Sequence, residues 1–270
     1  MARLVIGNWK MNGTPALLRA FAAAALREPP RCEAALCVPH PLLAAARTAF
    51  GTTALRWGAQ DCSAELDGAF TGEVSARLLA DLDTRYVILG HPERRLGHGE
   101  TDGQIAAKAQ RALAVGLTPV VCIGETAEER DGEQTSAVLR RQLLQLARLL
   151  GRRLAAVVLA YAPPWAASRH GCGDCVAPGL LEDTFAAIAE LLAFHAGLSA
   201  ASVRVIYGGS VDARNAGALL SLPGIGGVLV GAASLRPADF IEICKAAARC
   251  GDPPVRAASL WPVIATSARE

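Results

Sequence analysis

The sequence lacks the features that mark several large classes of protein. Its 270 residues carry a formal net charge of +2. No stripe of lysine and arginine is present, so an electrostatic surface for nucleic acid is not expected. No uninterrupted apolar run is long enough to cross a bilayer, and the apolar stretch at the N-terminus is too short for a signal peptide. We therefore expect a soluble, cytoplasmic protein that binds neither nucleic acid nor membrane.

The sequence also lacks a domain linker, a low-complexity segment and the GxGxxG fingerprint of dinucleotide-binding sheets. What it contains from end to end is an alternation of short apolar runs and amphipathic segments. The runs are continuously apolar, as expected of parallel strands that are covered on both faces. We predict eight strands, at residues 3–9, 34–38, 55–60, 86–90, 118–123, 156–161, 203–208 and 227–231.

Helices separate these strands. Long helices are predicted at residues 15–26, 101–115, 133–150, 178–194 and 237–249, and shorter ones at 41–49, 74–83 and 212–220. Eight strand–helix units in series predict an α/β fold, a single (β/α)8 TIM barrel over residues 1–251, with its chemistry at the carboxyl ends of the strands. An open doubly wound sheet is the alternative, and the uniform repeat argues against it. Residues 252–270 are rich in proline and are expected to form a C-terminal extension.

Eight cysteines are many for a protein of the reducing cytoplasm. Most lie in apolar surroundings and are expected to be buried, inert thiols. The pair Cys172 and Cys175 differs, because it lies in a loop rich in glycine and polar residues. The apolar group comprises Cys37, Cys62, Cys122 and Cys244.

Polar motifs follow six of the predicted strands at their carboxyl ends. In chain order they are GNWKMNG at residues 7–13, QD at 60–61 with DGAFTGE at 67–73, GHPERR at 90–95 with GETD at 99–102, CIGET at 122–126, YGGSV at 207–211 and LVGAASL at 229–235. In this order the motifs resemble the triosephosphate isomerase family along nearly the whole chain, apart from the C-terminal extension. The resemblance implies a barrel that binds a small phosphorylated aldose or ketose, without a cofactor or a metal.

The resemblance assigns the polarisation of the substrate carbonyl to the loops after the first and fourth strands. Lys10 would neutralise the charge of the substrate. Asn8 and His91 would face the carbonyl oxygen, where the charge of an enediolate develops. Glu93 is expected to pair with Lys10 and to orient it. Four further polar residues are expected to serve the scaffold or an interface: Gln60, Asp61, Arg95 and Glu100.

Two glycine turns, at residues 208–210 and 231–232, are expected to bind phosphate. Each turn can direct backbone N–H groups at an anion, and the second turn does so at a helix N-terminus. Taken singly they would be no more than tight turns; as an ordered pair they favour a phosphate site. Ala232 replaces a second glycine of the family and adds a methyl group, so we expect the phosphate to be slightly displaced. The predicted phosphate-binding residues are Gly171, Gly208, Gly209, Ser210, Gly231 and Ala232.

The loop at residues 67–73 resembles the protruding interface loop of the family. There, the residue that matches Thr71 reaches towards the active site of the neighbouring subunit. Phe70 and Thr71 therefore indicate a homodimer with a two-fold interface. An ordinary exposed loop is the alternative.

The segment at residues 161–166, YAPPWA, departs from the family. The resemblance places the catalytic glutamate at Ala162, and alanine cannot accept a proton. General base catalysis contributes about 10²–10⁴-fold in rate, so ordinary triosephosphate isomerase activity is predicted to be absent or severely impaired. Pro92 replaces the serine that holds this glutamate in relatives, and Pro164 stiffens the start of the lid. Loss of a base together with its partner indicates coordinated divergence.

The lid sequence at residues 168–175, SRHGCGDC, differs from the short Gly-Thr-Gly tip of relatives. It is open to three interpretations: a replacement base or nucleophile, a Cys-x-x-Cys redox pair or half of a zinc site, and a drifted surface loop. Metal is the weakest of these, because zinc takes three or four ligands and no second cluster is visible. The possible replacement groups are His170, Cys172, Asp174 and Cys175.

Two functional hypotheses follow. The first is a diverged enzyme that performs isomerase- or lyase-type enolisation of a small phosphorylated sugar with a relocated base. The intact set of Asn8, Lys10 and His91 favours it. The second is a catalytically inactive homologue that binds a phosphorylated metabolite or a partner protein, which Ala162 and Pro92 favour.

Overall fold

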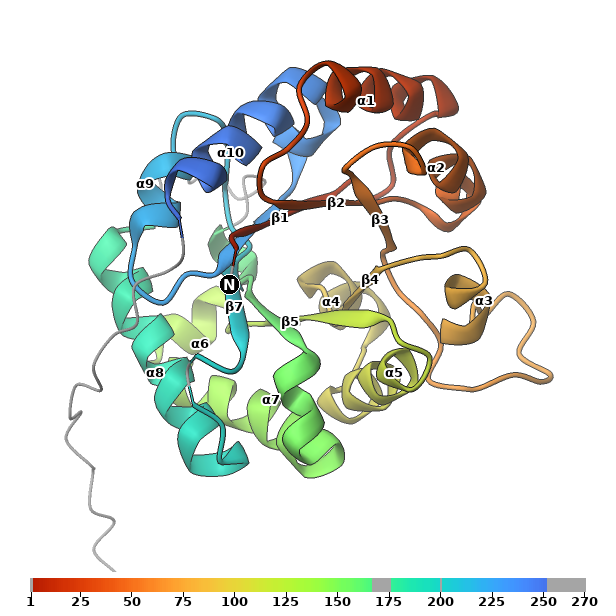
Figure 1. The fold of residues 1–270 in the computed structure, drawn as a ribbon. Coiled ribbons are helices and arrows are strands. Elements are labelled where there is room, and N and C mark those ends of the chain that lie inside the picture. The colour runs from red at the N-terminus through yellow and green to blue at the C-terminus, as the bar shows by residue number, and fades with distance from the viewer. Residues whose placement is uncertain (1, 167–175, 200, 252–270) are drawn as a thin grey trace, which may run out of the picture.

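The computed structural model describes residues 2–166, 176–199 and 201–251. Eight parallel strands close into a barrel in the order β1 to β8, and helices surround it (Figure 1). The predicted (β/α)8 fold is therefore confirmed. The predicted extension at residues 252–270 lies outside the described residues. No helix in the described ranges is both long enough and apolar enough to span a membrane.

The strands lie at the eight predicted apolar runs. One boundary is wrong by two residues: the sixth strand was expected from residue 156, but a 3-10 helix, Gly151–Ala156, occupies that position. The strands are β1 Leu4–Asn8, β2 Glu33–Cys37, β3 Arg56–Ala59, β4 Tyr86–Leu89, β5 Thr118–Ile123, β6 Val158–Tyr161, β7 Arg204–Tyr207 and β8 Gly227–Val230.

All eight predicted helices form, and two more helices accompany them. The predicted ones are α1 Pro15–Arg27, α2 Leu43–Phe50, α3 Ala76–Ala80, α5 Asp102–Ala114, α7 Thr135–Leu150, α8 Pro178–Ala196, α9 Ala216–Ser221 and α10 Pro237–Arg249. The helix predicted from residue 212 begins at Ala216 because Asp212 Oδ1 accepts hydrogen bonds from the N–H groups of Arg214 and Asn215, which forms a turn. The additional helices, α4 Pro92–His98 and α6 Ala127–Asp131, bury no residue and show no apolar periodicity.

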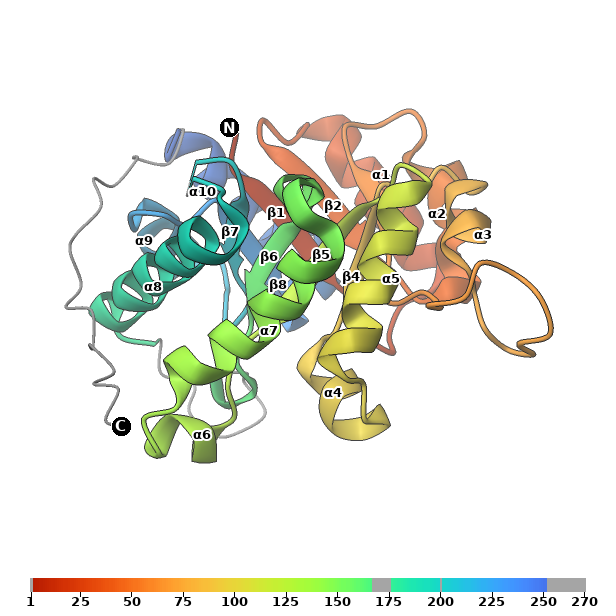
Figure 2. The ribbon, with the colours of Figure 1, turned by 90° about the horizontal axis from the view of Figure 1, so that it is seen from below.

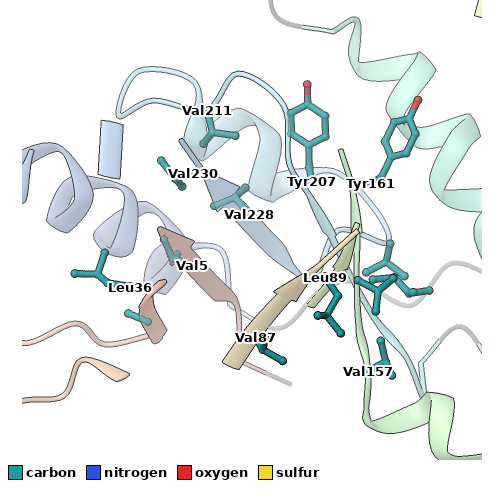
Figure 3. Packing of buried hydrophobic residues seen from close by; sticks show 14 of the residues in the cluster. Val5, Leu36, Val87, Leu89, Val157, Tyr161, Tyr207, Val211, Val228 and Val230 are labelled. Carbon is teal, nitrogen blue, oxygen red and sulfur yellow. The ribbon is translucent and has the colours of Figure 1, made fainter. Parts of the chain in front are cut away.

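Side chains of each strand alternate between two apolar layers. Leu4, Ile6 and Ile88 belong to a cluster inside the barrel. Val87 and Leu89, one residue away from Ile88 on either side, belong to the cluster between the strands and the helices (Figure 3). Both faces of the strands are buried, which explains why the runs are continuously apolar.

The four cysteines that were expected to be buried are buried. Burial raises the pKa of the Cys62 and Cys122 thiols to about 12, and it also raises the pKa of Cys37 and Cys244. In Cys244 a hydrogen bond with Cys32 is the larger cause. These thiols are protonated at neutral pH and are therefore poor nucleophiles.

The closure of the barrel depends on a close approach at Gly227, where β8 pairs with β1. A Cβ atom at this position would lie 2.0 Å from the carbonyl oxygen of Leu4. We predict that Gly227→Ala lowers the free energy of unfolding by about 1–3 kcal/mol, the usual cost of overpacking. Thermal and urea denaturation followed by circular dichroism measure the change. Gly217→Ala is the control, since a Cβ there meets nothing within 4 Å; equal stability of the two variants would contradict the prediction.

Candidate active site

A cavity of about 580 Å³ opens at the carboxyl ends of β1, β4, β6, β7 and β8. This is the end of the barrel at which α4 and α6 lie (Figure 2). The structure brings the predicted carbonyl-polarising residues and the two glycine turns together around this one cavity. Its lining includes Asn8, Lys10, His91, Glu93, Ala162, Gly208, Gly209, Ser210, Gly231 and Ala232.

Lys10 is held by its neighbours in an unusual backbone conformation, with φ of 51°. Its N–H donates to Asn8 Oδ1 at 3.1 Å, and its Nζ donates to Glu93 Oε1 at 2.6 Å, the pair expected from the sequence. Trp9, between Asn8 and Lys10, is fully buried and donates from Nε1 to the carbonyl oxygen of Ser234. A left-handed non-glycine residue costs free energy and is maintained only by surrounding contacts, which points to a functional requirement for this conformation.

His91 is the N-cap of α4, and its side chain is 15% exposed. Its pKa is lowered from 6.5 to about 4, chiefly by burial and secondly by the charge of Lys10, while Glu93 opposes both effects. The N–H of Glu93 donates to Nδ1 at 3.3 Å. Since a neutral imidazole carries one proton, Nε2 must hold it. At neutral pH His91 is therefore an uncharged hydrogen-bond donor.

Pro92 occupies the first position of α4. Proline suits this position because its missing N–H would have no partner within the helix and its φ is already helical. The geometry of the helix start therefore explains why a proline is favoured at position 92. Its apolar side chain lines the cavity.

Ala162 follows β6 and is 3% exposed. Its N–H donates to the carbonyl oxygen of Ile123 at 2.8 Å, and a Cβ at Gly208 would lie 2.8 Å from its methyl group. Two carboxylates line the cavity, and both are paired: Glu93 with Lys10, and Asp212 with Arg214. Among the residues that line the cavity in the described ranges, no carboxylate is left without a cationic partner.

The glycine turns differ in one respect from the prediction. The N–H of Gly208 donates to the carbonyl oxygen of Tyr161 at 2.8 Å, and the N–H of Ser210 donates to that of Ala166 at 3.0 Å. These two groups are therefore not available to an anion in this conformation. Within the described ranges, the N–H groups of Gly209, Gly231 and Ala232 donate to no other group.

Glu125 has a role that the sequence did not reveal. Its carboxylate is fully buried and accepts hydrogen bonds from Tyr161 Oη at 3.0 Å and Trp165 Nε1 at 3.1 Å. Arg130 lies 3.6 Å from the same carboxylate and stacks on the Trp165 ring at 4.3 Å. Tyr161 is on the outer face of β6 (Figure 3). Glu125 thus anchors the 3-10 segment Pro164–Ala166, directly after Ala162. In the sequence, Glu125 was noted only as part of the motif CIGET, which does not reveal this role.

The residues expected to serve the scaffold form ion pairs and backbone hydrogen bonds beside the site. Lys108 Nζ lies 2.8 Å from Asp61 and 2.6 Å from Glu100. Arg95 donates to Asp102, to the carbonyl oxygen of Gly90 at 2.9 Å and to that of Cys122 at 3.1 Å. Gln60 donates to the carbonyl oxygen of Cys37.

Five predicted groups lie outside the described residues. Among the residues that the structure does describe, no three histidine, cysteine, aspartate or glutamate side chains are placed to hold a metal ion. The five groups are His170, Gly171, Cys172, Asp174 and Cys175.

Comparison with known proteins gives one consistent result. The family model described as "Triosephosphate isomerase" matches residues 3–247. A triosephosphate isomerase from Bordetella pertussis is 46% identical over 252 residues, which covers 91% of this chain and 97% of that protein. One from Acidiphilium cryptum is 43% identical over 255 residues, which covers 92% of this chain and 100% of that protein. The crystal structure of triosephosphate isomerase from Bartonella henselae matches with a TM-score of 0.80 at 35% identity, covering 91% of this chain and 99% of that one.

The arrangement around His91 predicts opposite effects of two substitutions on its pKa. Lys10→Met should raise the pKa from about 4, because a neighbouring positive charge is lost, and Glu93→Gln should lower it, because a negative charge is lost. Titration of the imidazole signals by NMR measures both.

The stability of the protein should depend on the same group. Because the folded-state pKa of His91 is depressed, neutral His91 favours folding above pH 6.5, and this contribution to the free energy of unfolding is lost as the pH falls towards 4. A pKa of 6.5 in the native protein would contradict the assignment.

Proposed function

The chain belongs to the triosephosphate isomerase family, and from this premise we propose that its cavity binds a small phosphorylated aldose or ketose. The observation that carries the proposal is that Asn8, Lys10 and His91 line the same cavity as Gly209 and Gly231. Backbone N–H groups suit a phosphate, and the three side chains suit a carbonyl oxygen.

The proposed chemistry is enolisation. A base accepts the proton of the carbon next to the carbonyl, the C–H electron pair forms a C=C bond, and negative charge develops on the carbonyl oxygen. The ammonium group of Lys10 and the Nε2–H of neutral His91 stabilise this charge. Asn8 Oδ1 accepts from the Lys10 N–H, so its amide NH₂ is the end that can donate to the substrate.

The proton acceptor distinguishes this chain from the pattern of its family. The glutamate position holds Ala162, and both carboxylates that line the cavity in the described ranges are paired with cations. We therefore propose isomerase- or lyase-type enolisation with a base delivered from another position. The rate of triose phosphate interconversion would be far below that of a glutamate-containing relative.

A catalytically inactive homologue that binds a phosphorylated metabolite or a partner protein is the second candidate. Ala162 and Pro92 favour it, since together they replace the base and its resting partner with groups that cannot exchange a proton. The paired state of Glu93, which orients Lys10, is compatible with both candidates.

The substitution Ala162→Glu distinguishes the diverged enzyme from the inactive homologue. We expect the native protein to interconvert glyceraldehyde 3-phosphate and dihydroxyacetone phosphate slowly or not at all, and the variant to gain about 10² or more in kcat/KM, because a general base contributes about 10²–10⁴-fold. A coupled assay of triose phosphate interconversion measures it. His91→Ala in the Ala162→Glu background is the control and should abolish the gain.

Other outcomes decide between the candidates. An inert Ala162→Glu variant would show that Asn8, Lys10 and His91 do not stabilise the enediolate charge even when a base is present. This outcome would support the inactive homologue. Turnover of another phosphorylated aldose or ketose by the native protein, lost in His91→Ala, would exclude that candidate.

We also propose that the chain forms a homodimer through the loop at residues 67–73. This loop extends from the barrel between β3 and α3 (Figures 1 and 2). Phe70, in the middle of this segment, is 46% exposed, and Met11, in the loop after β1, is 96% exposed. Exposed apolar side chains on protruding loops are typical of surfaces that another subunit covers.

The dimer proposal predicts a mass of twice the 28.1 kDa of one chain in light scattering after gel filtration. Phe70→Asp should shift the mass towards that of one chain, because a buried charge without a partner opposes association. Phe194→Asp is the control: Phe194 is 84% exposed but lies on α8, away from this loop. Equal effects of the two substitutions would contradict the proposal.

A further inference from the structure

A second cavity of about 330 Å³ adjoins the first. The two cavities share four lining residues, and all four are apolar: Pro92, Leu96, Ala162 and Pro164. The smallest of them, Ala162, lies at the position where the family pattern has a longer, charged side chain. The residues at the junction between the cavities are therefore apolar, and Ala162 contributes only a methyl group there.

The wall of the second cavity is polar, and its charges nearly balance. Two guanidinium groups, of Arg95 and Arg141, face three carboxylates. Each nitrogen of the Arg95 guanidinium group donates one hydrogen bond: Nε to the carbonyl oxygen of Gly90, Nη1 to Asp102 and Nη2 to the carbonyl oxygen of Cys122. Glu100 is paired with Arg94 and Lys108, which do not line this cavity, so the other charges of the wall balance, two against two. Both guanidinium groups of the described wall already face carboxylates, which disfavours a second phosphate or carboxylate in this cavity, whereas uncharged hydroxyl groups carry no such penalty. The carboxylates belong to Glu100, Asp102 and Glu129.

Two side chains of this wall retain hydrogen-bonding capacity. Thr126 Oγ1 accepts from the N–H of Glu129 at 3.2 Å, and its hydroxyl proton is donated to no group in the described ranges. Arg141 is 57% exposed; its Nε lies 3.2 Å from Asp102, and its Nη2 lies 3.7 Å from Glu129. A guanidinium group has five N–H donors, so these two contacts leave donors for a ligand.

We propose that the two cavities form one site for a phosphorylated sugar of four or more carbons. Its phosphate lies in the first cavity, and its hydroxyl-bearing chain passes Ala162 to reach Thr126 and Arg141 in the second. This inference rests on the proposed function, because it requires that the first cavity bind a phosphate ester. It adds the size and the chemical character of the remainder of the ligand.

The test compares phosphorylated polyols of three, four and five carbons: glycerol 3-phosphate, erythritol 4-phosphate and ribitol 5-phosphate. They stay in open-chain form and have no carbonyl group, so calorimetry on the full-length protein measures binding without turnover. One or two added hydrogen bonds should tighten the dissociation constant by about tenfold from the three-carbon to the five-carbon ligand.

Two substitutions locate the effect. Arg141→Met should weaken binding of the longer polyol phosphates to nearly that of glycerol 3-phosphate and leave glycerol 3-phosphate unchanged. Arg148→Met is the matched control on the same helix, because Arg148 is exposed and lines neither cavity; it should change none of the three constants. Ala162→Leu, which narrows the junction, should reduce the preference for longer ligands independently of Arg141.

The outcomes are distinguishable. Equal binding of all three ligands, or a preference that survives both Arg141→Met and Ala162→Leu, would overturn the two-cavity site and leave the proposed function intact. If no polyol phosphate binds, both inferences fail together.

Discussion

The closed ring of parallel strands is the constraint on which the rest of this structure depends. β1 forms hydrogen bonds with β2 on one side and with β8 on the other, so no strand edge remains within the barrel. Because all strands run in one direction, their carboxyl ends meet at a single rim. Asn8, His91, Ala162 and Gly231, which are far apart in the sequence, line one cavity for this reason. Closure also imposes contacts so tight that only glycine fits, as at Gly227 beside Leu4.

Much of the fold could be predicted because buried parallel strands produce a signal that needs no tertiary information. The two helices that were missed, α4 and α6, are seven and five residues long and bury no side chain, so they have no periodicity to detect. The features that indicate these two helices are at their N-termini instead. They are Pro92 at the first position of α4, and the capping box formed by Thr126 and Glu129 at the start of α6. The start of β6 was misplaced because Ala155 and Ala156 are equally compatible with a strand and with the 3-10 helix that contains Ala156.

The site was predictable as a set of residues and not as a set of contacts. The motifs place the side chains at the rim, but a glycine turn does not reveal which of its N–H groups are already bonded; at Gly208 and Ser210 they are. Burial of the Glu125 carboxylate depends on Tyr161, Trp165 and Arg130, which the motif itself does not contain. The junction between the two cavities is lined by residues of α4 and of the segment after β6, which are about 70 residues apart in the sequence, and no local pattern encodes such a shape.

The hydrogen bond from the Ser210 N–H to the carbonyl oxygen of Ala166 has an energetic consequence for ligand binding. An anion that engages this N–H must first displace the Ala166 carbonyl, and Ala166 ends the short segment that Glu125 holds through Trp165. Part of the binding free energy is then spent on breaking that contact. The measured affinity would be lower than the intrinsic one, and the conformation after β6 would be thermodynamically coupled to occupancy of the proposed phosphate site. By reciprocity, any contact that draws the segment at residues 164–166 away from Ser210 would tighten anion binding by the same factor.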